Sequence, residues 1–92
     1  MHKVKMHIVD GHEYYGAIED GKPNGQGQKI MKGHDYDYHE FAGEFKQGQI
    51  INGDELIKHK NGTITLYVYE EGKKVTKITG KEGSDEETVE NL

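Results

Sequence analysis

The stretch YYGAIEDGKPNGQG, from Tyr14 to Gly27, decides how this chain folds. Successive side chains of a strand point to opposite faces, so Tyr14, Gly16 and Ile18 share one face. Residues 22–25 (Lys-Pro-Asn-Gly) suit a type I turn, because Pro presets φ at the second position and Gly is common at the last. The stretch therefore predicts a β-hairpin, and its glycines allow positive φ or the close approach of another backbone or ring.

The spacing of aromatic and glycine residues in this stretch recurs. Residues 41–48 (FAGEFKQG) repeat the pattern of residues 14–21, and the Asn-Gly pair at 52–53 matches that at 24–25 with one residue inserted. Residues 65–72 (TLYVYEEG) form a weaker third copy. Recurrence at about 20–50 residues indicates a repeat array. The positions that define the repeat are Tyr14, Gly16, Gly21, Gly25, Gly27, Phe41, Gly43, Gly48, Gly53 and Gly72.

These motifs resemble the MORN repeat. Residues 10–31 carry Asp-Gly-x-x-Tyr-x-Gly, four further residues, Gly, and then Lys-Pro-Asn-Gly-Gln-Gly. Residues 39–55 resemble the family moderately and residues 61–75 loosely. In the second copy Asn52 and Asp54, or Asp54 and Glu55 after the inserted residue, stand where glycines are usual. The resemblance implies consecutive antiparallel hairpins in an elongated open sheet. It also implies association with proteins and, in some members, with membranes, but no reaction and no catalytic residues.

The composition is that of a thin domain. The chain has 92 residues, of which 32% are hydrophobic, below the roughly 45–50% that is typical when glycine is counted. Such a chain cannot build a thick core, so a single-layer sheet would need cover from a second copy or a partner. We expect an all-β fold over residues 1–80, an antiparallel β-meander of consecutive hairpins in a MORN-like open sheet. Residues 81–92 are expected to be an acidic, disordered tail.

Hydrophobic alternation places further strands along the chain. A long strand over residues 35–46 changes face partway, and a bulge near His39 would account for this change. A turn is expected between Ile51 and Leu56. Other strands are expected over residues 2–9, 12–19, 26–31, 63–70 and 74–79.

The charge distribution and the targeting signals indicate which classes of partner the chain is expected to bind. All twelve basic residues are lysine, and most of the net charge of −5 comes from the tail. Arginine is the preferred residue for bidentate phosphate and guanine recognition, so we expect no direct nucleic-acid binding, and membrane binding is not favoured. No secretory signal or membrane span is visible, so the expected location is cytoplasmic.

Catalytic and metal chemistry are weakly supported. Asp35, Asp37 and His39 are expected on one face of a strand, where they are weak candidates for a divalent metal site. A solvated edge strand is the simpler interpretation, and we expect no metal and no cofactor. The chain has no cysteine, and its only serine, Ser84, lies in the tail. We therefore expect a protein that is not an enzyme.

Aromatic side chains are the best candidates for a binding surface, because tyrosine is enriched at protein interfaces. The first hypothesis is a small non-enzymatic protein-interaction module that self-associates or binds a protein partner. The alternative is an acidic inhibitor, for instance a viral one, of a nucleic-acid-handling enzyme, acting by charge complementarity. The candidate interface residues are Tyr36, Tyr38, Tyr67 and Tyr69, while Tyr14, Phe41 and Phe45 are expected to pack on the repeat glycines.

Overall fold

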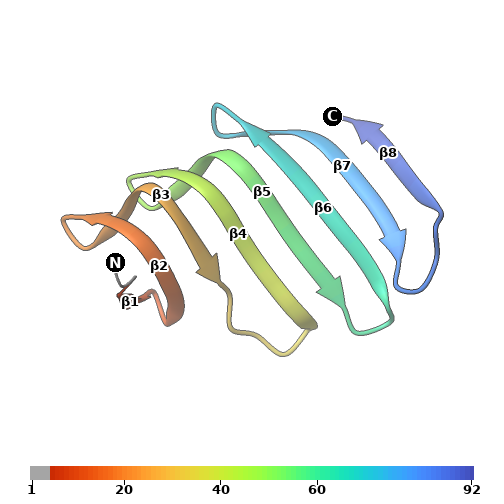
Figure 1. The fold of residues 1–92 in the computed structure, drawn as a ribbon, viewed down its shortest axis with the longest axis horizontal. Coiled ribbons are helices and arrows are strands. Elements are labelled where there is room, and N and C mark those ends of the chain that lie inside the picture. The colour runs from red at the N-terminus through yellow and green to blue at the C-terminus, as the bar shows by residue number, and fades with distance from the viewer. Residues whose placement is uncertain (1–4) are drawn as a thin grey trace.

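The computed structural model describes residues 5–92 and folds them into one open antiparallel sheet (Figure 1). Each strand pairs with the next in the chain, so the predicted all-β meander is confirmed. None of the described residues form a helix long and apolar enough to cross a membrane. In residues 5–92 the strands are β1 (Met6–Val9), β2 (His12–Glu19), β3 (Lys22–Ile30), β4 (Tyr36–Lys46), β5 (Gln49–His59), β6 (Thr63–Glu70), β7 (Lys73–Lys81) and β8 (Glu87–Asn91).

Two-residue turns close most of the hairpins. Asp20 and Gly21 both have positive φ, at 52° and 76°, as a type I′ turn requires. Both turn residues also have positive φ at positions 10–11, 47–48 and 71–72. The predicted type I turn over residues 22–25 is wrong, because Lys22 and Pro23 already pair with β2. A type I′ turn matches the right-handed twist of the strands, whereas a type I turn would splay them.

Strand β5 runs without interruption through the segment predicted as a turn. Gly53, in its middle, pairs with Gly43 of β4 and with Tyr69 of β6. This correction changes the role of the Asn-Gly pair in the second copy, which lies within a strand. The bulge predicted near His39 also lies elsewhere, since the register of β4 shifts between Tyr36 and Tyr38.

The C-terminal segment differs from the predicted disordered tail. Residues 87–91 form β8, which pairs antiparallel with β7, and Ile78 lies opposite Val89. All residues of β8 are exposed. The backbone of β7 offers hydrogen-bonding groups whatever the side chains of the added strand, so polar, acidic composition alone does not prevent pairing.

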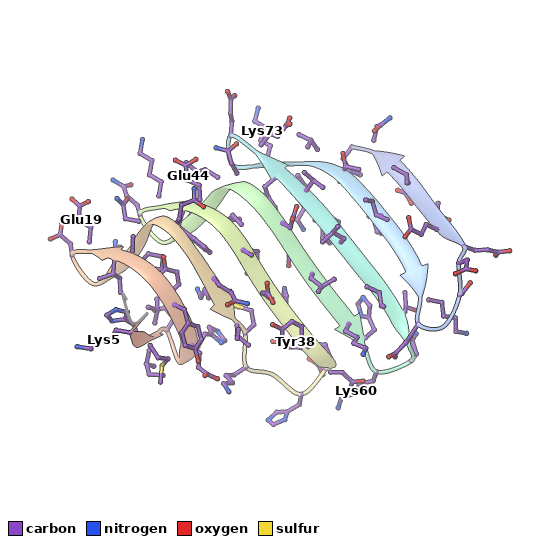
Figure 2. All side chains as sticks on the ribbon, in the orientation of Figure 1. Lys5, Glu19, Tyr38, Glu44, Lys60 and Lys73 are labelled. Atoms are coloured by element: carbon purple, nitrogen blue, oxygen red, sulfur yellow. The ribbon has the colours of Figure 1, made fainter. Side chains whose placement is uncertain are left out.

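Two asparagines join successive hairpins in the same way, close to the turns at which Figure 2 labels Glu19 and Glu44. Asn24 donates its side-chain amide to Glu19 (3.1 Å), and its Oδ1 accepts the backbone N–H of Gln47 from the next hairpin (3.3 Å). The contact with the backbone N–H links one repeat to the next without requiring a thick core, while the bond to glutamate stays within the hairpin. In the second copy, Asn52 donates to Glu44 (3.0 Å) and accepts from the N–H of Glu71 (3.2 Å).

The buried core lies on one face of the sheet and centres on Tyr14, which is 0% exposed. The Tyr14 ring meets Phe45 edge-on at 5.5 Å between centroids, and its hydroxyl donates to the carbonyl of Ala17 (2.7 Å). We call this side the core face and the opposite side the back face. In cross-strand register, the core face carries Tyr14, Lys29, Phe41, Glu55, Tyr67, Lys77 and Glu90, and the back face carries Glu13, Ile30, Glu40, Leu56, Leu66, Ile78 and Val89.

Four glycines stand side by side across the core face. Gly16, Gly27, Gly43 and Gly53 pair in turn from β2 to β5, and we call them the glycine row. A Cβ on Gly16 would lie 2.5 Å from the carbonyl oxygen of Gln26 and 2.5 Å from the Cα of Gly27. The ring of Tyr14 occupies the space above Gly27 that a side chain there would need. The row therefore lets the backbones approach and makes room for the core.

Replacing a glycine of this row should destabilise the fold. Gly43→Ala would place a Cβ against the backbone of Asn52, at a φ of 142° that favours glycine. We expect the free energy of unfolding to fall by about 3 kcal/mol or more. Gly62→Ala is the matched control, because Gly62 also has positive φ (89°) but no atom within 4 Å of the added Cβ. The control should lose about 1–2 kcal/mol. Urea denaturation measures both, and equal losses would show that steric room in the row is unimportant.

Candidate functional site

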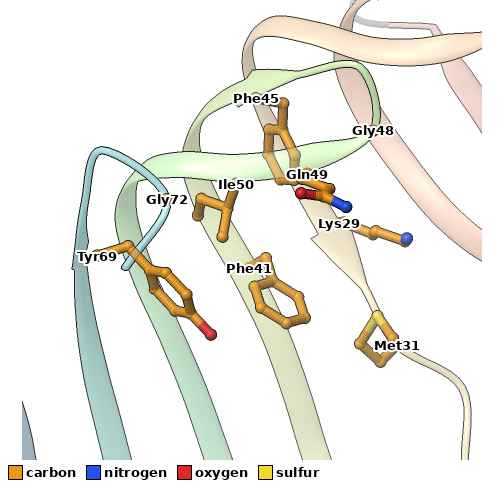
Figure 3. A pocket seen from close by; sticks show the side chains of 9 residues that line it. All are labelled: Lys29, Met31, Phe41, Phe45, Gly48, Gln49, Ile50, Tyr69 and Gly72. Carbon is orange, nitrogen blue, oxygen red and sulfur yellow. The ribbon is translucent and has the colours of Figure 1, made fainter. Parts of the chain in front are cut away.

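A trough of about 340 Å³ opens on the core face beside the buried core (Figure 3). Its walls are mainly apolar and come from β4, β5 and β6, and two hairpin turns contribute glycines at its end. Lys29 of β3 and Gln49 of β5 supply its long polar side chains. The lining residues are Lys29, Met31, Phe41, Phe45, Gly48, Gln49, Ile50, Tyr69 and Gly72.

The trough borders the end of the glycine row, because Tyr69, which lines the trough, pairs with Gly53. The Tyr14 ring fills the space above Gly27, whereas the two atoms nearest to the Cβ positions of Gly43 and of Gly53 are backbone atoms of the neighbouring strand. Ile50 approaches this part of the row, with its Cδ1 3.0 Å from the Cβ position of Gly53. The depression itself lies between the aromatic residues of β4 and Tyr69 of β6.

A buried carboxylate holds one wall of the trough in place. Glu55 is only 6% exposed. Its Oε2 lies 2.6 Å from Nε2 of His39, and its Oε1 accepts the hydroxyl of Tyr69 (2.7 Å). Lys74 lies at 3.8 Å from the same Oε1. A buried carboxylate is costly unless it is paired and hydrogen-bonded, and here both oxygens have partners.

Aromatic contacts extend this arrangement. The Phe41 ring lies between those of His39 and Tyr69, at centroid distances of 5.3 and 6.3 Å. Burial and the hydrogen bond to Glu55 raise the pKa of Tyr69 well above the ordinary tyrosine value. The Tyr69 hydroxyl therefore stays protonated and keeps donating to Glu55 at neutral pH. Chemically, the trough is a preformed apolar depression, and the hydrogen bond from Tyr69 to Glu55 holds its aromatic wall in position.

The four candidate interface tyrosines do not form one surface. Tyr69 lines the trough, and Tyr67 lies on the same face beneath the ammonium group of Lys74, 4.0 Å from the ring centroid. Tyr36 packs edge-on against His39 at 4.9 Å. Tyr38 points to the back face, where its hydrogen bond to Glu40 raises its pKa to about 12. All four are half-buried, and only Tyr69 contributes to the trough.

The structure does not bring the weak metal candidates together. Asp35 precedes β4, Asp37 lies at the register shift, and the imidazole of His39 is engaged with Glu55. The prediction that these residues share one face is wrong, because the bulge interrupts the alternation of side chains. Over residues 5–92, no group of three or more His, Cys, Asp or Glu side chains is placed to hold a metal ion.

Sequence reasoning missed several residues of the site. Glu55 lies two positions after Gly53, and in an uninterrupted strand this spacing puts it on the same face as the glycine row. The expected turn between Ile51 and Leu56 hid that relation. No sequence pattern marked Met31 or Ile50 as a site residue, because their roles depend on which strands lie beside them.

No family model, curated protein or solved structure matches the chain. Inference about its function therefore rests on the geometry. Lys29 lies opposite Phe41 at the trough and makes no ion pair within the described part of the chain. The trough thus combines apolar walls with a cation that can pair with a bound group.

Tyr69 should make the fold sensitive to alkaline pH. Its folded-state pKa is raised above 10.0, so its stabilising contribution is complete below the pKa of the unfolded chain. That contribution is lost as the pH rises through the raised folded-state pKa. We expect Tyr69→Phe to lose less free energy of unfolding than the wild type between about pH 9 and about pH 11. Urea denaturation at both values measures this.

The matched control for this pH experiment is Tyr67→Phe. It removes a hydroxyl from the same strand and face but keeps the hydrogen bond from Tyr69 to Glu55. This variant should retain the alkaline loss that Tyr69→Phe reduces. An equal loss in Tyr69→Phe and the wild type would contradict a stabilising role for the protonated Tyr69 hydroxyl.

Proposed function

We propose that the chain is a non-enzymatic protein-interaction module built from MORN-like β-hairpin repeats, and that it binds a segment of a partner protein in the trough. The observation that carries this proposal is the preformed apolar trough on the core face. Its wall is held by Glu55, whose two oxygens are engaged by His39 and Tyr69. A rigid depression lowers the cost of ordering on binding, which favours recognition.

Two repeated features support the MORN-like assignment. The glycine row crosses four consecutive strands, and its members come from the first two copies of the sequence repeat. The asparagine contacts also recur, with Asn24 and Asn52 each bridging a glutamate of its own hairpin and the next turn. Recurrent local contacts of this kind are how repeat proteins transmit order from one unit to the next.

The chemistry of the trough indicates what the partner segment contains. Phe41, Phe45 and Ile50 can surround an apolar side chain, as at the buried centre of protein interfaces. The Lys29 ammonium group can then pair with a carboxylate beside that anchor. We infer a partner segment with a large apolar residue next to an acidic residue.

The arrangement of polar groups supports a binding role over catalysis. Both oxygens of Glu55 are occupied, so this carboxylate is committed to holding His39 and Tyr69. The chain has no cysteine, and its one serine, Ser84, lies outside the trough lining. We place this module in the cytoplasm as part of the proposal. The acidic inhibitor stays as the alternative prediction.

Peptide binding tests the proposal. The isotope-labelled full chain is titrated with short acidic peptides that each carry one Leu, Phe or Trp, and amide shifts are followed by NMR. We expect shifts at Met31, Phe41, Ile50 and Tyr69. Peptides in which serine replaces the apolar residue should leave these signals unchanged, because the anchor is missing. Shifts elsewhere only, or none with any peptide, would contradict binding in the trough.

A charge-reversal pair separates specific recognition from general attraction. Lys29→Glu should weaken the binding of the acidic peptides by about tenfold, since it replaces an attraction with a repulsion at the trough. Lys60→Glu makes the same change in net charge at the exposed β5–β6 turn, where Figure 2 labels Lys60, and this residue does not line the trough. This control should bind as the wild type does. Equal weakening by both variants would show that only net charge matters.

A further inference from the structure

The two edges of the sheet hold all the large apolar side chains that are exposed in residues 5–92. Met6 (44% exposed) and Ile8 (64%) lie on β1, and Val89 (61%) and Leu92 (60%) lie on or directly after β8. Among residues 5–92, each of these two strands has one neighbouring strand in the sheet (Figure 1). An edge strand with exposed apolar residues is a template for pairing with another chain.

The free side of β8 can accept another strand. The N–H of Leu92 donates to the carbonyl of Val75 in β7 (3.0 Å). Backbone groups of alternate residues point to the same side of a strand, so those of Val89 and Asn91 point away from β7. All side chains of β8 are exposed, and none of them covers this side.

Side chains of the two edges are complementary on both faces. On the core face of β8, Glu90 lies opposite Lys77. On the core face of β1, His7 lies opposite Tyr14, and Lys5 comes two residues before His7. On the back face, Val89 belongs to the row of Ile78, while Met6 and Ile8 share the face of Glu13. Val89 and Glu90 of one edge thus present an apolar residue and an acid where the other edge presents apolar residues and bases, and Glu87 shares the back face with Val89.

We propose that β8 of one copy pairs with β1 of a second copy, head to tail, so that the meander continues from chain to chain. Strands alternate in direction along the sheet, so β1 of a similarly oriented copy runs antiparallel to β8. Placing Val89 opposite Met6 also places Glu90 opposite Lys5. A shift of two residues towards the β1–β2 turn would instead bring Glu87 opposite Asp10, and like charges directly opposite are destabilising.

This pairing is heterologous and does not close on itself. Each junction uses β8 of one copy and β1 of the next, and leaves a free edge at each end for further copies. It uses the sheet edges and leaves the trough open. Partner binding in the trough and growth through the edges can therefore be tested separately, and either can fail without the other.

Engineered cysteines test the junction directly, because the chain has no cysteine of its own. Met6→Cys and Val89→Cys proteins are mixed at high concentration under mild oxidation. Residues directly opposite in an antiparallel pair have Cα atoms about 4.5–5.5 Å apart, within the range that a disulfide spans. We expect the mixed dimer to exceed both single-variant dimers severalfold.

The alternatives give different products. Val89→Cys dimers in excess would indicate tail-to-tail pairing of two β8 strands and would overturn the proposal. A mixture of Val89→Cys with Ile8→Cys should cross-link less than the mixture with Met6→Cys, and the reverse would overturn the register. Lys60→Cys, at an exposed turn, gives the level of cross-linking that arises from random collisions. A mixed dimer no more abundant than this level would also overturn the proposal.

Charge exchange provides the second measurement, using light scattering over a range of concentrations. Glu90→Lys and Lys5→Glu should each weaken association by about tenfold, because each replaces an attraction with a repulsion. Mixing the two variants pairs opposite charges again and should restore the wild-type mass. A wild-type mass that stays monomeric at all concentrations, or variants that associate as the wild type does, would overturn the proposal.

Discussion

The close approach of four neighbouring strands at the glycine row is the constraint on which the rest of the structure depends. A Cβ on Gly16 would collide with the backbone of β3, and one on Gly43 with that of β5. Without side chains in this row, Tyr14 can lie over Gly27 and become fully buried in a single-layer sheet. The trough borders the end of this row, where Tyr69 pairs with Gly53. One steric requirement thus produces the core beside which the candidate site lies.

The buried carboxylate of Glu55 gives that site a fixed shape. A thin sheet excludes water poorly, so side chains on its face are mobile unless something anchors them. Here the costs of burying Glu55 are offset by His39, Tyr69 and Lys74, and the Phe41 ring is held between two of these partners. The same thinness leaves two edges with exposed apolar side chains, so the face and the edges are separate surfaces for association.

Much of the architecture could be predicted from local patterns. Alternating side chains and the recurring spacing from Tyr14 to Gly21 predicted a meander of hairpins, because strand alternation and positive φ at glycine are local properties. Residues such as Asp10-Gly11 are turn formers in any β context. Predictions failed where several local readings compete. Residues 22–25 fit a turn locally, but the type I′ turn at Asp20-Gly21 agrees better with strand twist.

By itself, the sequence determined the strand periodicity, the repeat and the low apolar content that makes the sheet thin. Only the tertiary structure decided the register, since that depends on which residues face one another across strands. Register places Gly53 beside Gly43, keeps β5 continuous and brings Glu55 to His39 and Tyr69. It also adds residues 87–91 to the edge of β7. A backbone edge binds a strand through N–H and C=O groups that every residue but proline carries, so composition alone could not reveal it.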